Sequence, residues 1–318
     1  MAKLVLVFLA AALLVVLHLA PSPDDNALWR ALTNALHAPA FALVAIGVLE
    51  LVRRRRRTGS TLALYTIAFA VTAFIAAFME LIQVIGSRSA SLHDWLRDLA
   101  GAAAGLILYA SLGHRAPGAA RAVIWTTRLV AVAVMLSGLI PVVRLSHAYI
   151  RRDAAFPVLG AFEAPWESTF WRAQEGALDL VAPPPGWPRE EGARVARVRL
   201  EPGRYPGVRL REPYENWEAY DTLELSLYSP DPEPFTLSLR IHDASHTNAQ
   251  DDRYNTRFEI GPGSHTLRIA LDDVRRAPEG RELDLCRVAG LIIFVARLQE
   301  PRTLYLDDVR LVARGDGS

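Results

Sequence analysis

Acidic, amide and imidazole side chains interrupt the apolar first half of the chain, and such groups can transfer protons or hydrogen-bond a ligand. Glu80 and Gln83 are three residues apart, and Asp94 and Asp98 are four apart, so each pair shares one face of a helix. A polar side chain inside an apolar helix costs free energy, which makes each of these residues a candidate for function. The polar cluster consists of His37, Glu80, Gln83, Arg88, His93, Asp94 and Asp98.

Five apolar stretches must position this cluster, and each is long enough, at about 20 residues, to cross a hydrocarbon core of about 30 Å. They are residues 4–20, 35–52, 61–85, 96–112 and 123–143. Arg53–Arg57 lies between the second and third stretches and predicts a cytoplasmic loop there. The N-terminus is then cytoplasmic, the C-terminal domain is extracytoplasmic, and the polar cluster lies near the outer interface on three helices.

The first stretch also resembles a secretory signal, because Lys3 precedes the apolar run and Pro21 follows it. The run is long for a signal, and no small-x-small cleavage site ends it. We therefore expect a retained spanning helix, with cleavage as the alternative. The protein is expected in the cell (inner) membrane as a multi-pass protein, with the lipid bilayer as a partner.

The formal net charge of +1 hides two unlike halves. Residues 1–150 carry 13 Lys and Arg against 6 Asp and Glu, whereas residues 151–318 carry 22 against 28. This division excludes a single soluble domain. A nucleic-acid binder is also excluded, because the one dense basic run lies between two apolar stretches. The single cysteine, Cys286, excludes an internal disulfide and a cysteine-based zinc site.

Residues 151–318 predict an all-β fold. Short segments such as TLELSLY at 222–228 and FTLSLRI at 235–241 alternate apolar and polar residues, and turns rich in Pro and Gly bound them. Many short strands at this spacing are typical of an antiparallel jelly-roll sandwich. The expected fold class is multi-domain: an all-α transmembrane bundle of about five spans in residues 1–150, then an all-β sandwich in residues 151–318.

A polar stretch of the second half contains groups that recognise hydroxyls. It follows an apolar strand and offers Asp243, His246, Arg253 and Asn255 for hydrogen bonds, while Trp217 offers a flat surface for stacking. We predict these five residues as the ligand site of the sandwich. Two alternatives stay open: a loop that is hydrogen-bonded only to itself, and a tryptophan that belongs to the core.

The polar residues of the first half also follow a recognisable order of motifs. These are LTNALHAPAF around His37, Glu80-Leu-Ile-Gln83, Arg88, and Asp94-x3-Asp98-x2-Gly101-x3-Gly105. Over about residues 1–115 they resemble the VanZ-like membrane proteins, which implies a cell-envelope setting but no defined reaction. Two residues depart from the pattern. Asn34 stands where the family often has Asp, and Asp98 stands where it usually has Asn. Gly101 and Gly105 predict a small-residue face on which another helix packs closely.

Several segments of the second half resemble the galactose-binding-like jelly rolls found among carbohydrate-binding modules, over about residues 155–313. They include NWEAYDTLELSLYSP from Asn216, DDRYNTRF from Asp251 and LYLDDVRLV from Leu304. The resemblance implies a structural calcium ion joining the first and last strands, with Glu163 and Asp307 as its ligands, because calcium prefers carboxylate oxygens. The alternative is that these two carboxylates pair with arginines or cap turns. No other cofactor is expected.

Two functions from different classes follow. The first is an integral membrane protein of the cell envelope, not an enzyme, whose extracytoplasmic module binds glycan or another envelope component. The alternative is a membrane enzyme acting on a lipid-linked envelope precursor, with Glu80 or Asp94 as base and His37 or His93 as acid. A third interpretation makes the cluster a hydrogen-bonded brace between helices. A transporter has less support, since the stretches predict neither a broken helix nor an inverted repeat.

Overall fold

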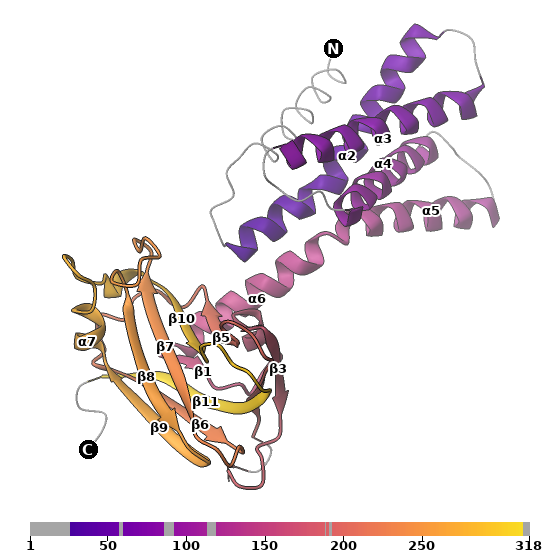
Figure 1. Ribbon diagram of the computed structural model, residues 1–318. Coiled ribbons are helices and arrows are strands. Elements are labelled where there is room, and N and C mark those ends of the chain that lie inside the picture. The colour runs from indigo at the N-terminus through magenta and orange to yellow at the C-terminus, as the bar shows by residue number, and fades with distance from the viewer. Residues whose placement is uncertain are drawn as a thin grey trace. The chain divides into compact units, whose positions relative to one another are not determined.

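The chain divides into two compact units, a helical unit Met1–Ser146 and a sandwich unit His147–Ser318. The computed structural model describes residues 26–56, 60–85, 92–112, 119–187, 189–190 and 193–313 (Figure 1). The division falls inside helix α6 (Leu139–Ala155), a few residues before the boundary expected at 150/151. The first predicted span, residues 4–20, lies outside the described residues.

The helical unit contains α2 (Ala27–Arg55), α3 (Thr61–Ile85), α4 (Leu92–Leu112), α5 (Ala119–Leu136) and the first part of α6. Asn26 caps α2, because its Oδ1 accepts the backbone N–H of Trp29 at 2.8 Å. The same helix ends at Arg53–Arg55, where cations interact favourably with the helix dipole.

Two described helices are long and apolar enough to cross a membrane, α2 and residues Thr61–Leu81 of α3. Helices α5 and α6 together would make a third, although they are bent by 46° at their junction. The described residues therefore support fewer spans than the five expected. The prediction of an unbroken fifth span over 123–143 is wrong, since the helix stops at Leu136 and restarts at Leu139. Gly138 at this junction favours such a break.

Glycines let α2 and α4 approach closely. A Cβ added at Gly101 would lie 2.4 Å from the carbonyl oxygen of Ala38, and one at Gly105 would lie 2.5 Å from the Cβ of Ala42. Real Cβ contacts are never so short, so only glycine fits at these two positions. The predicted small-residue face of α4 is confirmed, and α2 is the helix that packs on it.

The sandwich unit is built from two antiparallel sheets, as the sequence predicts. One has the order β3-β4-β11-β6-β9, with β1 also paired to β11, and the other has the order β2-β5-β10-β7-β8 (Figure 1). The strands of the first sheet are β1 (Val158–Gly160), β3 (Gly176–Val181), β4 (Val195–Leu200), β6 (Thr222–Ser229), β9 (Gly263–Ala270) and β11 (Arg302–Val312). The strands of the second are β2 (Trp171–Gln174), β5 (Gly207–Arg211), β7 (Phe235–Asp243), β8 (Tyr254–Ile260) and β10 (Val288–Phe294).

The core of this unit lies between the two sheets. Alternate residues of β6 and β7 are fully buried there, because successive side chains of a strand point to opposite faces. Examples are Leu223, Leu225 and Leu227 on β6, and Leu237, Leu239 and Ile241 on β7. Short helices, α7 (Leu271–Arg275) and the 3-10 turns Pro165–Thr169 and Leu285–Arg287, connect the strands.

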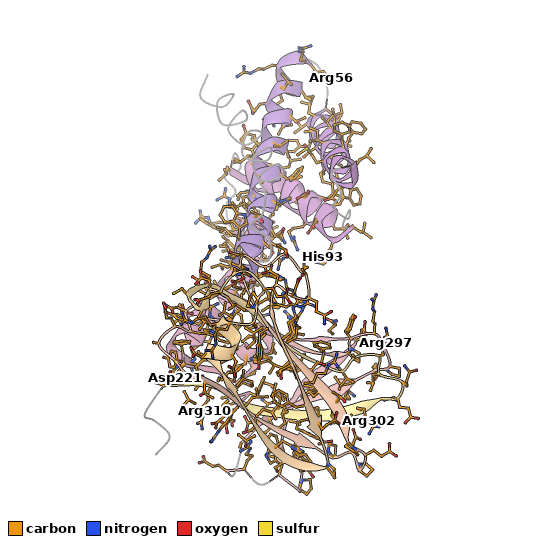
Figure 2. The ribbon with its side chains drawn as sticks, turned by 60° about the vertical axis from the view of Figure 1, so that its left-hand side comes forward. Arg56, His93, Asp221, Arg297, Arg302 and Arg310 are labelled. Atoms are coloured by element: carbon orange, nitrogen blue, oxygen red, sulfur yellow. The ribbon has the colours of Figure 1, made fainter. Side chains whose placement is uncertain are left out.

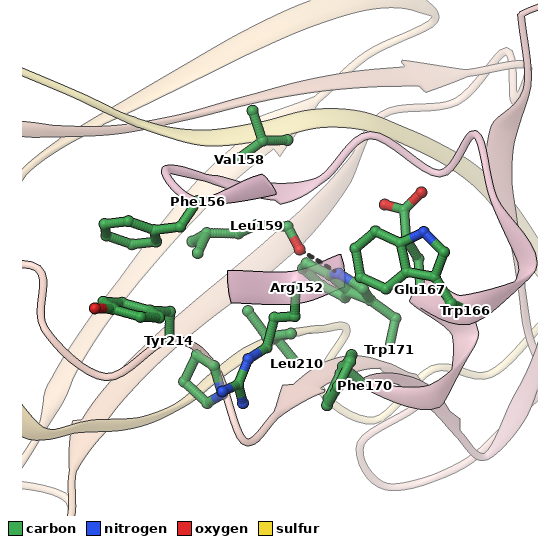
Figure 3. Close-up of a pocket in the computed structure, with 11 residues that line it drawn as sticks. Arg152, Phe156, Val158, Leu159, Trp166, Glu167, Phe170, Trp171, Leu210 and Tyr214 are labelled. Atoms are coloured by element: carbon green, nitrogen blue, oxygen red, sulfur yellow. Dashed lines mark hydrogen bonds between the residues drawn. The ribbon is translucent and has the colours of Figure 1, made fainter. Parts of the chain in front are cut away.

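The C-terminal part of α6 belongs to the sandwich unit. Ala148 is buried in the sandwich core, and Tyr149 and Phe156 pack against it. Arg152 donates to the carbonyl oxygen of Glu212 at 2.7 Å and lies over the ring of Phe170. A pocket with room for about one water molecule remains beside this contact, lined by Arg152, Phe156, Trp171 and Tyr214 among others (Figure 3). The core is drawn from residues 148–311, so residues 147–318 have a hydrophobic core of their own.

Candidate functional site

A buried polar pair joins α2 and α4 in the helical unit. The Nδ1 atom of His37 lies 3.1 Å from the Oδ1 atom of Asp98, and the two residues are only 8% and 1% exposed. Asp98 lies one turn before the glycine contact at Gly101. The pair therefore joins the two helices where their backbones approach each other.

The other residues of the predicted polar cluster have different surroundings. Asp94 forms an ion pair with Arg97 on the same helix, at 2.8 Å. Glu80 is buried on α3, and His93 is exposed. Gln83 lies in α3, but its side chain is outside what the structure describes, and Arg88 lies outside the described residues.

A polar pocket of about 440 Å³ opens in the helical unit beside these residues. Its polar lining comprises Arg30 and Asn34 from α2, His93 and Arg97 from α4, and Ser137 from the junction of α5 and α6. The carboxylates of Asp94 and Asp98 point to Arg97 and His37, respectively. The pocket thus offers hydrogen-bond donors and positive charge rather than the carboxylate base of the enzyme hypothesis.

In the sandwich unit, the predicted ligand residue Asp243 braces a loop. It is 0% exposed, and its Oδ1 accepts Arg281 Nη2 at 3.0 Å. Burial alone would raise its pKa, but hydrogen bonds from Arg281 and from the N–H groups of Asp284 and Ser245 hold the pKa below the ordinary value. Asp252, which also binds Arg281, closes the loop. Because these oxygens are used internally, the contacts of Asp243 favour the alternative of a loop hydrogen-bonded to itself.

Trp217 fits the alternative of a tryptophan that belongs to the core. Its side chain is 0% exposed, and its Nε1 donates to the carbonyl oxygen of Tyr214 at 2.7 Å. The ring belongs to the core of the sandwich, as the alternative interpretation had it. It cannot serve as a stacking surface for a ligand in this conformation.

His246, Arg253 and Asn255 lie near one another at one end of strands β7 and β8. His246 and Arg253 both contact Asn248, at 3.1 and 3.2 Å, and Asn255 donates to the carbonyl oxygen of Gln250 at 3.0 Å. The alternative of a loop hydrogen-bonded to itself therefore describes part of this stretch. Asn255 is exposed and is the cross-strand register partner of Arg240 on β7.

That register points to residues that the sequence prediction missed. Arg240 and His242 occupy alternate positions of β7, so both project from the outer face of the five-stranded sheet. The alternation was visible in the segment LSLRIHD, since its apolar residues are the buried ones. The outer face, which we call the arginine face, carries Arg172, Gln174, Arg209, Arg211, Thr236, Ser238, Arg240, His242, Asn255, Arg257, Glu259, Ile292 and Phe294.

Gly290 makes room for His242 on this face. The two residues are register partners on β10 and β7, and a Cβ at Gly290 would lie 2.6 Å from the imidazole Cε1. The ring of His242 therefore lies across strand β10. Its centroid is 4.1 Å from that of His246.

The local field on the arginine face is positive. Burial, and then the neighbouring charges of His246, Arg240 and Arg253, lower the pKa of His242 to about 3. Burial and the charge of Arg253 lower the pKa of Arg240 to about 10. His242 is therefore a neutral imidazole at physiological pH, with one ring nitrogen to donate and one to accept.

The residues predicted to bind calcium have an arginine beside them. Arg189 Nε lies 3.0 Å from a carboxylate oxygen of Asp307, and Glu163 accepts the backbone N–H of Arg194 at 3.1 Å. Burial, and then the charge of Asp308, raise the pKa of Asp307 to about 6. The described residues contain no group of three or more His, Cys, Asp or Glu that could hold a metal ion. The contacts favour the arginine-paired alternative and do not fit a calcium ion at Asp307.

Comparison with known proteins gave a likeness to solved structures alone. No family model matches the chain, and no curated protein matches it. The family 11 carbohydrate-binding module from Clostridium thermocellum, in complex with a beta-1,3-1,4-mixed-linked tetrasaccharide, is 13% identical with a TM-score of 0.36, over 45% of this chain and 88% of that one. CBM28, a non-crystalline cellulose specific carbohydrate-binding module, is 13% identical with a TM-score of 0.34, over 50% of this chain and 95% of that one. An exo-beta-agarase is 13% identical with a TM-score of 0.39, over 49% of this chain and 25% of the enzyme.

Proposed function

We propose that this chain is a membrane-anchored protein of the cell envelope whose sandwich unit binds a glycan or another envelope component through the arginine face. The observation that carries the proposal is the combination on that face of hydrogen-bonding side chains with an aromatic pair. The rings of Tyr205 and Phe294 meet edge to face, with their centroids 5.7 Å apart. Tyr205 is 41% exposed, and Phe294 is half-buried on β10.

This combination suits a sugar chain. The C–H faces of sugar rings are apolar and gain from contact with aromatic rings, whereas their hydroxyls need donors and acceptors. Asn255, Arg240 and the neutral His242 supply both kinds of group within two neighbouring strands. The ligand would lie across the strands, because Phe294 on β10 and these polar groups on β7 and β8 stand on different strands of one sheet.

The helical unit serves as the anchor in this proposal. Helices α2 and α3 have the length and apolarity of spans, and the arginines at the end of α2 favour a cytoplasmic position for the loop that follows. If residues 4–20 and α4 also cross the membrane, as in the five-span topology expected from the sequence, the N-terminus is cytoplasmic and the sandwich unit extracytoplasmic, in the cell membrane. The helical unit is proposed to be VanZ-like, on the strength of its motifs and of the His37–Asp98 contact between α2 and α4.

The hypothesis of a membrane enzyme has less support than binding. Two of its four candidate residues, His37 and Asp94, are engaged with Asp98 and Arg97. The pocket of the helical unit is lined by Arg30, Asn34, His93 and Arg97, which suits an anionic or polar headgroup better than proton abstraction.

Screening residues 147–318 on an array of envelope glycans and plant or algal polysaccharides tests the binding proposal. We expect specific binding that Phe294→Ala and Tyr205→Ala weaken by at least about tenfold. Tyr305→Ala, on the opposite sheet, is the matched control and should bind normally. Thermal melts check that each variant is folded. The absence of binding to any glycan by the folded fragment would refute the proposal.

Topology is tested separately with reporters fused to the full chain. Alkaline phosphatase, which is active only outside the cytoplasm, should be active when fused after residue 318 and inactive when inserted between residues 56 and 60. The reverse pattern would place the sandwich in the cytoplasm and contradict the envelope setting.

A further inference from the structure

The arginine face carries a charge opposite to that of its surroundings. Its outward strand positions hold five arginines, Arg172, Arg209, Arg211, Arg240 and Arg257, against the single acidic residue Glu259. Residues 151–318 as a whole have 22 basic against 28 acidic residues. We propose that this face binds a polyanionic glycan, a polysaccharide bearing carboxylate, sulfate or phosphate groups. The inference rests on the proposed function and names its ligand class.

The outer face of the other sheet shows that this excess is not a general feature of the domain. There, Arg197 and Arg199 each lie 3.1 Å from Asp179. Arg310 of strand β11 (labelled in Figure 2) and Arg268 bind the two carboxylate oxygens of Glu224, at 3.1 and 3.0 Å. Arginine and carboxylate thus occur together on the six-stranded sheet.

Three arginines of the arginine face lack a carboxylate partner among the described residues. Within the part of the chain that the structure describes, Arg172, Arg209 and Arg257 form no ion pair with a carboxylate. Arg240 and Arg253 direct donors to the side-chain and backbone oxygens of Asn248 instead. Arg172, Arg209 and Arg257 are exposed to solvent and are therefore open to an anionic ligand, whereas Arg240 is partly buried beside them.

Two arginines of this face stand directly opposite each other. Arg172 on β2 and Arg209 on β5 are direct cross-strand partners. Like charges at such positions repel each other and destabilise a sheet. An anion bound between them would relieve that repulsion. Anion binding therefore explains why two arginines stand at these positions, which exposure to solvent alone does not.

The spacing of the charges suits a linear polymer. In the cross-strand register, Arg172, Arg209, Ile292 and Arg240 form one row across four strands. Neighbouring strands lie about 4.8 Å apart, so the charges of this row fall within about 15 Å. The planar guanidinium of arginine matches carboxylate, sulfate and phosphate groups with two parallel hydrogen bonds.

The groups between the arginines favour a glycan over other polyanions. Asn255 and the neutral His242 are amide and imidazole groups suited to sugar hydroxyls. Phe294 and Tyr205 flank the row with aromatic surface. A face that bound lipid headgroups would need apolar side chains to enter the bilayer, and Ile292 and Phe294 are only half-exposed between polar neighbours.

The test compares two forms of one polymer on the full-length chain in a non-ionic detergent. The probes are polygalacturonate and its carboxyl-reduced, neutral counterpart. We expect the acidic form to bind at least about tenfold more tightly, with affinity falling as salt rises from about 50 mM to about 500 mM. The double variant Arg209→Gln/Arg240→Gln should lose at least about tenfold in affinity for the acidic form. Arg199→Gln and Arg268→Gln, on the other sheet, are matched controls and should bind as the unmodified chain does.

Three outcomes would overturn the inference, and they separate it from the proposed function. Equal binding of both polymers, lost in Phe294→Ala, would leave a glycan-binding module with no preference for charge. Equal or tighter binding of phosphatidylglycerol vesicles or of single-stranded DNA through the same arginines would replace the glycan by another polyanion. Failure to bind polygalacturonate, its neutral counterpart and dextran sulfate would contradict the inference. The proposed function would be contradicted as well only if the fragment also bound nothing on the wider glycan array.

Discussion

Arg172 and Arg209 face each other as direct cross-strand partners at one side of the five-stranded sheet. Because like charges so placed repel, we expect Arg172→Gln to raise the free energy of unfolding of residues 147–318 by about 0.2–1 kcal/mol. The same change should weaken binding of an anionic glycan. Urea denaturation and a binding titration on one preparation measure the two effects.

Arg199→Gln is the control for this prediction, because Arg199 is an exposed cross-strand arginine that pairs with Asp179. Its removal should leave stability the same or slightly lower, since surface ion pairs contribute at most about 1 kcal/mol. A loss of stability in Arg172→Gln as well would mean that the two opposed arginines do not repel each other in the folded protein.

Gly290 sets the position of the imidazole on the arginine face. Gly290→Ala places a methyl group about where the ring of His242 lies, so the ring must leave strand β10. We expect a cost of about 1–3 kcal/mol in stability and a weaker ligand affinity. The histidine should also titrate closer to its ordinary pKa once it leaves its buried position, which NMR of the imidazole would detect.

Gly261→Ala is the matched control, since nothing lies within 4 Å of a Cβ at that position. It should change neither the binding nor the titration of His242. If Gly290→Ala left the pKa of His242 at about 3, the ring would not depend on the glycine, and the geometry argued for this face would fail.

Asp243 holds the loop between β7 and β8 through its buried ion pair with Arg281. Asp243→Ala removes one partner of that pair, and we expect a loss of roughly 3–5 kcal/mol in stability. Because the folded-state pKa of Asp243 is depressed, its stabilisation is present above the unfolded pKa near 3.8 and is lost as pH falls below that value. Chemical denaturation between about pH 3 and about pH 7 should show this dependence in the unmodified fragment and not in the variant.

Hydrogen exchange of the loop amides gives an independent check. The amides of Ser245 and Asp284 donate to Asp243, so their protection should fall in Asp243→Ala. Exchange in the distant strand β4 should rise no more than global stability requires. Unchanged protection at both amides would show that Arg281 and Asp252 hold the loop without Asp243.

The sequence predicted local patterns well and residue environments poorly. Alternation in β6 and β7 identified the strands, and the spacing of Gly101 and Gly105 identified the close helix contact, because both signals are carried by neighbouring residues. The chemistry of Asp243 and Trp217 suits ligand binding. Their burial depends on Arg281 and on the core, which are distant in sequence.

The arginine face is a site that sequence patterns alone do not predict. Each strand contributes one or two polar outward positions, which in isolation look like an ordinary solvated surface. Only the register that aligns Arg172, Arg209 and Arg240 across β2, β5, β10 and β7 reveals a continuous charged row. Register between strands far apart in the chain is set by tertiary packing, and no local pattern encodes it.

Variants at the contact between His37 and Asp98 test whether the polar cluster of the helical unit is a structural brace or a ligand site. If the pair is a brace, His37→Asn should lower the thermal stability of the full chain in detergent. Gly101→Ala should lower it more than His37→Asn does, because the added Cβ would lie 2.4 Å from a backbone oxygen of α2. Ala100→Ser, at the neighbouring exposed position, is the control. Full stability in His37→Asn would argue against the brace.

Asp307 gives a prediction with a defined dependence on pH. Its folded-state pKa, raised to about 6, lies above the unfolded value of 3.8, so the folded protein binds the proton more tightly and loses stability as pH rises through this window. Asp307→Asn cannot ionise and escapes that loss. The stability of the variant relative to the unmodified fragment should therefore improve by about 1–3 kcal/mol between about pH 4 and about pH 7.5.

Denaturation in EDTA and in calcium tests whether Arg189 is the counter-charge of Asp307. If it is, the unmodified fragment should be equally stable in both solutions. A calcium-dependent rise that Asp307→Asn abolishes would instead establish a calcium site at Glu163 and Asp307.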